Sequence, residues 1–150
     1  MSDNPDFLYD FVIRHSWHRI SRMYNAKAAD YDMTMSIGFL LMNVDKEGTP
    51  STALGPKMGM EPTSLSRTLK TMEDKGLIIR KEDAIDKRKV LVFLTLEGVE
   101  KRKLVRDFVL GFNDKIFAKI PASKMKAFYE VAFKVDALIE EELKNKIVNK

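Results

Sequence analysis

Residues 62–98 read PTSLSRTLKTMEDKGLIIRKEDAIDKRKVLVFLTLEG, and this stretch decides the fold. Its first part predicts a helix, because Pro62 is a good first helical residue and Gly76 suits the left-handed position that ends a helix. Residues 77–81 and 90–94 predict two strands, the second of them rich in β-branched and aromatic side chains. A charged loop joins the two strands into a hairpin. The stretch therefore predicts a helix followed directly by a β-hairpin.

Helices are predicted on both sides of this stretch. A long apolar helix covers residues 7–27, Thr34 can cap a second helix, and Ser51 or Thr52 can cap a short third one. After the hairpin, Thr95 can cap another long helix, and Pro121 separates that helix from the last. A helix pair followed by a hairpin is the order of a winged helix-turn-helix. We expect a mainly α protein with a small β-hairpin.

The helix over residues 62–75 has two different faces. Leu65, Leu69 and Met72 recur at helical spacing and should face the core. Small hydroxyl residues and cations occupy or flank the opposite face, which suits a major groove because they can reach phosphates and base edges. We predict that this helix contributes the following DNA-binding residues: Thr63, Ser64, Ser66, Arg67, Lys70 and Thr71. The alternative is an ordinary amphipathic surface helix.

The loop between the strands carries the cations Lys87, Arg88 and Lys89. Cations at a hairpin tip can enter a minor groove or clamp a phosphate backbone, so these three complete the predicted DNA-binding set. A carboxylate two residues before Arg88 can pair with it and fix its direction. A solvated turn is the alternative, but the position directly after a candidate recognition helix favours DNA.

Composition is consistent with one globular domain. The chain has 150 residues, of which 45% are hydrophobic and 32% charged, and a formal net charge of +4. It has no cysteine, which excludes disulfides and thiolate metal sites. It has no apolar run of membrane-spanning length and no signal-peptide pattern at its start, so we expect no membrane partner and a cytoplasmic location.

The same residues resemble a known family. The run from Pro62 to Ile78 is similar to the recognition helix of the MarR family, residues 83–88 to its wing motif, and residues 90–98 to the strand and helix start that follow. Ile85 departs from the pattern, because the family usually has an arginine there, and Pro56 is unusual in the first helix of the motif. The resemblance covers nearly the whole chain.

The resemblance implies a homodimer that regulates transcription from a pseudo-palindromic operator on double-stranded DNA. It implies one MarR-like domain, with a winged helix-turn-helix DNA-binding lobe over about 34–95 and N- and C-terminal dimerisation helices over about 6–30 and 96–147. The sequence supports a dimer independently, because both ends carry more apolar residues than a small domain needs to bury: Phe7, Leu8, Phe11, Val135, Ile139 and Leu143. Packing within one chain is the alternative.

The family often binds a small aromatic or anionic effector in a cleft between the dimer helices and the DNA-binding lobe. Five residues are candidates for lining such a cleft: Arg14, Trp17, His18, Tyr24 and Phe39. Aromatic residues at helical spacing are more often core than pocket, so a core role is the alternative. His15 and His18 have a metal-chelating spacing, but no cysteine accompanies them, and we predict no metal site.

Nothing in the sequence indicates catalysis or a cofactor. It has no phosphate-cradling glycine loop and no thiol nucleophile, although a Ser/His/Asp site could be assembled from distant residues. We predict a protein that is not an enzyme. The rival hypothesis is a non-catalytic winged helix that binds protein or RNA. The outer face of the helix over residues 62–75 distinguishes a DNA-binding protein from this rival, because a face that docks onto protein should be more apolar.

Overall fold

The computed structural model describes residues 8–148, and the side chains up to residue 145. The elements within that range are helices α1 (Tyr9–Ala29), α2 (Met35–Asn43), α3 (Ser51–Met58), α4 (Pro62–Asp74), α5 (Leu96–Lys119) and α6 (Ala122–Val148), and strands β1 (Thr49–Pro50), β2 (Ile78–Glu82) and β3 (Val90–Leu94). The chain divides into two compact units, one up to Arg106 and one from Asp107 onwards. The boundary falls within α5.

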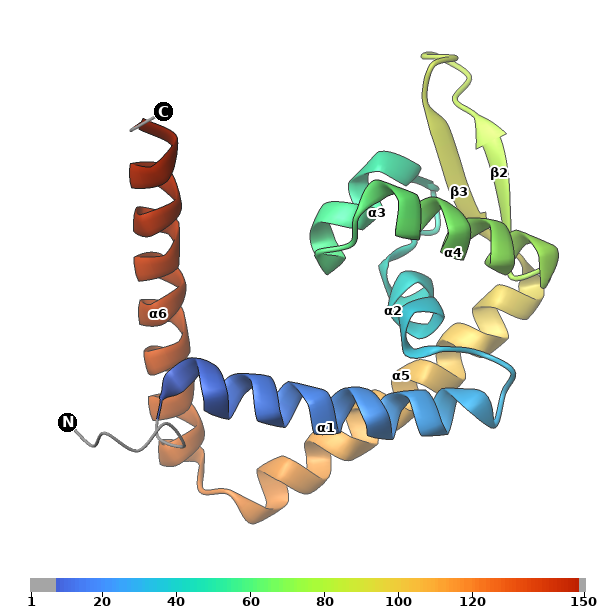
Figure 1. Cartoon of the computed structure of the whole chain (residues 1–150). Coiled ribbons are helices and arrows are strands. Elements are labelled where there is room, and N and C mark those ends of the chain that lie inside the picture. The colour runs from blue at the N-terminus through green and yellow to red at the C-terminus, as the bar shows by residue number, and fades with distance from the viewer. Residues whose placement is uncertain (1–7, 149–150) are drawn as a thin grey trace. The chain divides into compact units, whose positions relative to one another are not determined.

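The first unit is built around α2, whose side chains are almost all apolar. Its core joins α2, α3, α4 and the sheet, and its fully buried large side chains are Leu40, Leu41, Val44, Leu54, Met72, Ile78 and Val92. Figure 1 shows α3 and α4 beside one another, with the β2–β3 hairpin extending beyond them. This is a winged helix-turn-helix, and the predicted fold class, mainly α with a small hairpin, is confirmed.

The sheet has a third strand that sequence analysis missed. β3 lies between β1 and β2, and both neighbours pair with it in antiparallel fashion. Thr49 of β1 is buried and pairs with Val92 of β3, directly after a turn at Gly48. Gly48 has a φ of 92°, and a Cβ there would lie 2.6 Å from the ring of Phe93. Only glycine fits this turn against that ring.

The helix ends agree with most of the predicted capping residues. The Thr34 hydroxyl accepts a hydrogen bond from the Ile37 N–H at 3.3 Å at the start of α2. At the end of α4, Gly76 has the expected left-handed backbone, with a φ of 69°. The Thr95 hydroxyl accepts from the Gly98 N–H at 3.0 Å and donates to the Gly76 carbonyl at 2.6 Å. This one residue therefore ties the exit of α4 to the start of α5.

One predicted cap was wrong. α3 begins at Ser51 itself, directly after Pro50, and no side chain caps it, so neither Ser51 nor Thr52 has the predicted role. The reason is that Pro50 belongs to β1 and leads straight into the helix. Pro56 lies inside α3 without ending it, and the helix stops at the left-handed Gly59.

The second unit consists of the rest of α5 and of α6. None of its side chains up to residue 145 is buried. Several large apolar side chains are exposed on it, among them Phe128, Phe133, Leu138, Ile139 and Leu143, and Phe133 is 70% exposed. Phe128 and Tyr129 meet edge to face at 5.9 Å between ring centroids. The unit by itself leaves this apolar surface uncovered.

The N-terminal half of α1 is also apolar and exposed. Leu8, Val12, Ile13 and Trp17 are all exposed, whereas Phe11 and, in the second unit, Val135 are half-buried. The predicted apolar surplus at both ends is therefore present, except that Phe7 lies outside the described residues. Within the described part of the chain, no helix is long and apolar enough to cross a membrane.

Candidate nucleic-acid interface

The recognition helix α4 is anchored by its inner face. Leu65, Leu69 and Met72 are buried, as their spacing predicted. An ion pair also ties α4 to the sheet. Arg80 of β2 donates through Nε at 3.1 Å and through Nη2 at 2.5 Å to Oε2 of Glu73. This hydrogen-bonded ion pair lowers the pKa of the Glu73 carboxyl and raises that of Arg80. Both contacts fix α4 against the hairpin, so its outer face is held in one position.

The outer face of α4 is exposed along its whole length. All six residues predicted to contact DNA are exposed: Thr63, Ser64, Ser66, Arg67, Lys70 and Thr71. Pro62, which has no N–H, begins the helix and no side chain caps it, so the backbone N–H groups of Thr63 and Ser64 stay available, whereas the Leu65 N–H donates to the Glu61 carbonyl at 3.0 Å. Free amides at a helix N-terminus are donors for a phosphate.

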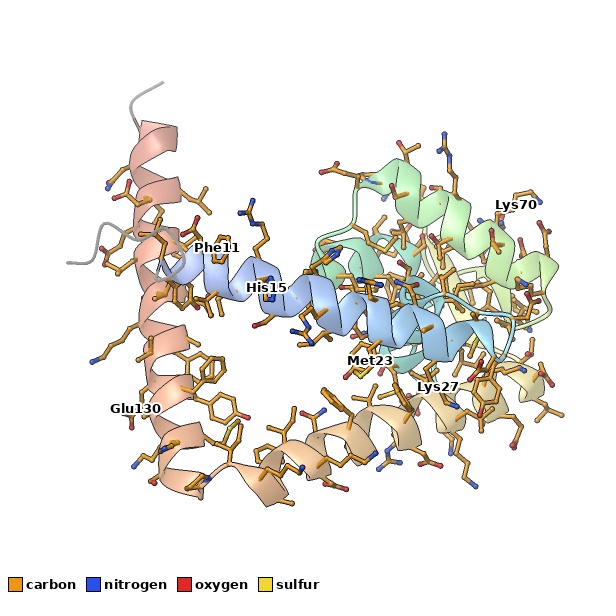
Figure 2. The ribbon with its side chains drawn as sticks, turned by 60° about the horizontal axis from the view of Figure 1, so that its bottom comes forward. Phe11, His15, Met23, Lys27, Lys70 and Glu130 are labelled. Carbon is orange, nitrogen blue, oxygen red and sulfur yellow. The ribbon has the colours of Figure 1, made fainter. Side chains whose placement is uncertain are left out.

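Two of these six side chains already have partners. Lys70 (labelled in Figure 2) forms an ion pair with Asp74 at 3.2 Å, and the Thr71 hydroxyl donates to the Arg67 carbonyl at 3.0 Å. The (i, i+4) spacing of Lys70 and Asp74 could have indicated that pair from the sequence. Within residues 8–145, no hydrogen bond or ion pair is made by the other four of these side chains, which lie on the first turns of α4: Thr63, Ser64, Ser66 and Arg67. This end of α4 is therefore the part best suited to reading bases.

The wing is built by its two aspartates. The Asp83 carboxylate accepts hydrogen bonds from the backbone N–H groups of Ile85 at 2.7 Å and Asp86 at 3.1 Å, which lower its pKa. Oδ1 of Asp86 accepts from both the backbone N–H and Nε of Arg88, each at 3.2 Å. The carboxylate two residues before Arg88 thus pairs with it as predicted. The negative charges of Asp83 and Asp86 would repel DNA, but both carboxylates stabilise the shape of the loop through these hydrogen bonds.

The cations of the wing point outwards. The Arg88 side chain is 92% exposed although Asp86 holds its Nε. The two terminal nitrogens of the guanidinium therefore stay available for a phosphate or a base edge. Lys87 and Lys89 are exposed as well, with Lys89 3.9 Å from Asp86. Ile85 is 98% exposed at the same tip.

A hollow of about 590 Å³ lies between α3, α4 and the base of the wing. Ser66 of α4, Arg80 of β2 and Val90 of β3 are among the residues that line it. Sequence analysis missed Arg80, because only the fold brings this strand residue back against Glu73. The recognition helix and the wing thus form one continuous surface.

Comparisons with known proteins agree with this geometry. Residues 34–90 match the family model described as "MarR family". Over these residues the chain is similar to the MarR family.

Two curated relatives of the chain are bacterial regulators. It is 29% identical over 93 residues to the transcriptional regulator HosA of Escherichia coli, covering 61% of this chain and 67% of HosA. It is 27% identical over 139 residues to the HTH-type transcriptional regulator TtmR of Methylorubrum extorquens, covering 78% of this chain and 71% of TtmR.

Solved structures match the fold of the chain. It superimposes on Staphylococcus aureus MepR in a DNA complex with a TM-score of 0.81 at 18% identity, over 89% of this chain and 99% of MepR. It superimposes on CouR of Rhodococcus jostii RHA1, bound to p-coumaroyl-CoA, with a TM-score of 0.78 at 18% identity, over 89% of this chain and 95% of CouR. The predictions of family and fold are confirmed.

The residues predicted to bind an effector fall into two groups. Phe39 of α2 stacks with Trp17 at 6.3 Å and meets Tyr24 edge to face at 6.1 Å, so these three aromatic rings form one cluster. Burial raises the pKa of the Tyr24 hydroxyl. The Arg14 guanidinium lies instead over the ring of Phe11, 5.8 Å from its centroid. The structure therefore brings together the aromatic members of the set.

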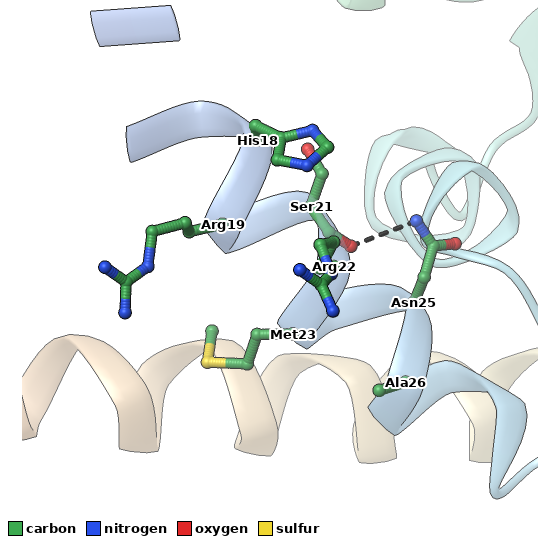
Figure 3. Close-up of a pocket in the computed structure, with 7 residues that line it drawn as sticks. All are labelled: His18, Arg19, Ser21, Arg22, Met23, Asn25 and Ala26. Carbon is green, nitrogen blue, oxygen red and sulfur yellow. Dashed lines mark hydrogen bonds between the residues drawn. The ribbon is translucent and has the colours of Figure 1, made fainter. Parts of the chain in front are cut away.

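His18 lines a separate hollow of about 730 Å³ along α1 (Figure 3). Arg19, Arg22 and Met23 lie in the same hollow, and Asn25 donates to the Ser21 carbonyl at 3.0 Å. The Ser21 hydroxyl is buried without a hydrogen-bond partner. Polar side chains therefore line much of this hollow.

The two histidines lie on α1, with His18 three positions after His15. His15 stacks on Phe11 with 6.3 Å between the ring centroids, and both lie on α1 (Figure 2). Over residues 8–148, no group of three or more acidic, histidine or cysteine side chains is placed to hold a metal ion. Both histidines are exposed side chains of the first helix.

Proposed function

We propose that this chain binds duplex DNA as a homodimer and thereby regulates transcription. Its similarity to the MarR family and to curated transcriptional regulators supports the coarse function, regulation of transcription. The observation that carries the finer proposal is the surface made by the start of α4 and the wing. The start of α4 exposes hydroxyl side chains and Arg67, and the wing exposes Arg88, whose Nε Asp86 holds in position.

The N-terminal part of α4 is assigned to the major groove and the wing to the neighbouring minor groove or backbone. Ser64, Ser66 and the free helix amides suit phosphate oxygens, and Arg67 suits the paired acceptors of a guanine edge. A protein-docking helix would present apolar side chains there, and none of the six outer residues is apolar. Duplex RNA is a poor partner, because its major groove is too narrow for a helix.

A second copy of the chain is proposed to cover the exposed apolar side chains of both ends. Four examples are between 47% and 70% exposed in one chain: Val12 of α1, and Phe133, Ile139 and Leu143 of α6. Large apolar side chains of this kind mark an interface rather than a free surface. A two-fold dimer repeats the reading helix at roughly 34 Å, one turn of DNA, so its operator should be pseudo-palindromic.

Sedimentation equilibrium with added duplex DNA tests this proposal. The wild-type chain should sediment as a dimer, with two chains for each bound duplex. Leu143→Glu should shift the chain toward monomer and weaken DNA binding with it, whereas Glu140→Gln on the same helix should change neither. A wild-type chain that stays monomeric at micromolar concentration and binds DNA singly would contradict the proposed dimer.

The aromatic cluster is proposed to respond to a small aromatic or anionic effector. Its three rings gather Trp17, Tyr24 and Phe39, and Trp17 is the one tryptophan of the chain. Tryptophan fluorescence therefore reports directly on this site. A saturable change with an aromatic acid, absent from Phe39→Ala, would support the proposal, and a spectrum that stays constant across a library of such acids would count against it.

No catalytic activity is assigned to this chain, because its curated relatives are regulators and not enzymes. A location in the cytoplasm follows from the proposed DNA target. Duplex DNA that fails to bind at any salt concentration would favour the rival function, a winged helix that docks onto protein.

A further inference from the structure

The tip of the wing carries one large apolar side chain that the fold does not use. Residues 83–89 join β2 to β3, and Ile85 is the one large apolar residue among them. Its side chain is 98% exposed, and among residues 8–145 no large apolar side chain is more exposed. Single apolar residues are ordinary on a protein surface, so the meaning of Ile85 depends on its position and on the rigidity of its backbone.

The backbone that carries Ile85 is held by hydrogen bonds. Oδ1 of Asp83 accepts from the backbone N–H groups of Ile85 at 2.7 Å and of Asp86 at 3.1 Å. The Asp83 N–H donates at 2.9 Å to the carbonyl of Lys89, whose own N–H donates at 2.8 Å to the carbonyl of Asp86. β2 and β3 stay paired up to the residues that flank this loop. The Ile85 side chain therefore projects from a fixed point.

The side chains of this loop are sorted by chemistry. Asp83 and Asp86 are half-buried, and the other residues of the loop are exposed: Ala84, Ile85, Lys87, Arg88 and Lys89. The loop, at the free end of the hairpin in Figure 1, thus presents an apolar side chain beside three positive charges. Duplex DNA has the complementary chemistry, because negative phosphates line its grooves and the apolar faces of the bases are stacked between them.

Ile85 cannot read base edges, because its side chain has no hydrogen-bonding group. Isoleucine is among the apolar side chains that proteins insert into the minor groove as wedges, which partly unstack two base pairs and kink the duplex. Its branched Cβ keeps it stiff, so little rotamer freedom is lost on insertion. An arginine at this position would instead be attracted by the negative potential of a narrow A-tract groove.

We infer that Ile85 is a wedge that enters the minor groove at a pyrimidine–purine step, TA or CA/TG, next to the bases read by α4. Such steps unstack and kink more easily than others, so a wedge favours them without touching a base edge. Lys87 and Arg88 bind the phosphates that flank the opened step. This inference rests on the proposed DNA binding and names the feature of the DNA that the wing recognises.

The first test compares the sequences that the wild-type chain and Ile85→Ala select from a random duplex DNA pool. Both proteins should enrich the same half-site, because α4 is unchanged. The wild type should also enrich a pyrimidine–purine step at a fixed distance from that half-site, and Ile85→Ala should lose this enrichment. Ile85→Leu keeps a large apolar side chain and should retain it. The exposure of Ile85 makes all three proteins equally able to fold.

The second test uses a duplex selected by the wild type, with 2-aminopurine placed in the pyrimidine–purine step. The fluorescence of this base rises when it unstacks, so wild-type protein should raise it and Ile85→Ala should not. Replacement of the step by an A-tract should weaken wild-type binding by about tenfold or more, and binding of Ile85→Ala by less than about threefold.

Lys87→Ala is the matched control from the same loop, because it removes a charge and keeps the wedge. It should weaken binding of both duplexes by the same factor, and the ratio of the two affinities should stay at the wild-type value.

The outcomes distinguish this inference from the proposed DNA binding. A wild-type chain that binds no duplex, or enriches no half-site, would overturn both. A half-site without the neighbouring step, or a step that Ile85→Ala enriches equally, would overturn the wedge alone. Constant 2-aminopurine fluorescence at saturating wild-type protein would also overturn it, because Ile85 would then lie outside the base stack.

Discussion

Removal of the wing arginine should change how DNA binding responds to salt. The guanidinium of Arg88 is 92% exposed, and Asp86 uses only its Nε, so the rest of the group can neutralise a phosphate. Each phosphate contact that is lost reduces the slope of log K against log salt by about 0.9. A dimer has two wings, so Arg88→Ala should reduce the slope by about 1.8.

That change in slope is large enough to measure by fluorescence anisotropy with a labelled duplex. Between about 50 and about 200 mM salt, a difference of about 1.8 in slope corresponds to roughly a 12-fold difference in affinity. The ratio of wild-type to Arg88→Ala affinity should therefore be roughly 12-fold greater at the lower salt concentration. The affinity advantage of the wild-type protein over Arg88→Ala is greatest at low salt, because its additional phosphate contacts release counterions from the DNA.

Two controls separate charge from geometry. Arg88→Lys keeps the charge and should keep the slope, although it loses the fork that Asp86 holds. Lys115→Ala removes an exposed cation outside the unit that contains the wing, and it should have the wild-type slope. If Arg88→Ala also has the wild-type slope, the wing does not touch the DNA backbone and the assignment of this loop is wrong.

Four further perturbations test other parts of the account. Arg67→Ala should cost about 1–3 kcal/mol of DNA binding and relax preference at one base pair in a competition assay; equal weakening on all duplexes would make Arg67 a phosphate contact. Ile85→Arg adds a cation at the wing tip and should steepen the salt slope by about 0.9 per wing; an unchanged slope would place the tip away from DNA. Leu69→Ala, at a site 2% exposed, should lower the free energy of unfolding in urea by about 2–5 kcal/mol, and a smaller loss would show that this face of α4 is not packed. Arg80 lowers the pKa of Glu73 in the folded state. The pair therefore stabilises the fold fully at pH values above the pKa that Glu73 has in the unfolded chain, and this stabilisation is lost as the pH falls through the pKa of Glu73 in the folded chain. On acidification, the melting temperature of the Glu73→Gln variant should fall less than that of the wild type. Parallel plots of melting temperature against pH for the two proteins would refute this.

The sequence predicted those features that depend on local spacing. Leu65, Leu69 and Met72 recur at helical spacing, and the structure buries all three. Arg88 follows Asp86 by two residues, a separation short enough to predict their ion pair, and the pair is present. Such patterns can be recognised without the fold, because both partners lie on one element.

Features that depend on residues far apart in the sequence could not be predicted, because the partners come together only in the folded chain. β1 has two residues, too few to show the alternation of a strand, and only its pairing with Val92 defines it. The bond from Arg80 to Glu73 requires the chain to reverse at Gly76 and the strand to return along the helix. Lys46 and Arg106 lie 60 positions apart in the sequence, so the hollow of about 390 Å³ that both line forms only in the folded unit.

The central claim is that a dimer of this chain reads a specific DNA sequence with α4. Selection of bound sequences from a random duplex DNA pool at physiological salt tests it most directly. The account predicts enrichment of a palindrome whose half-sites are separated by about one helical turn. Salt-sensitive binding without any enriched motif, or no binding at all, would contradict it.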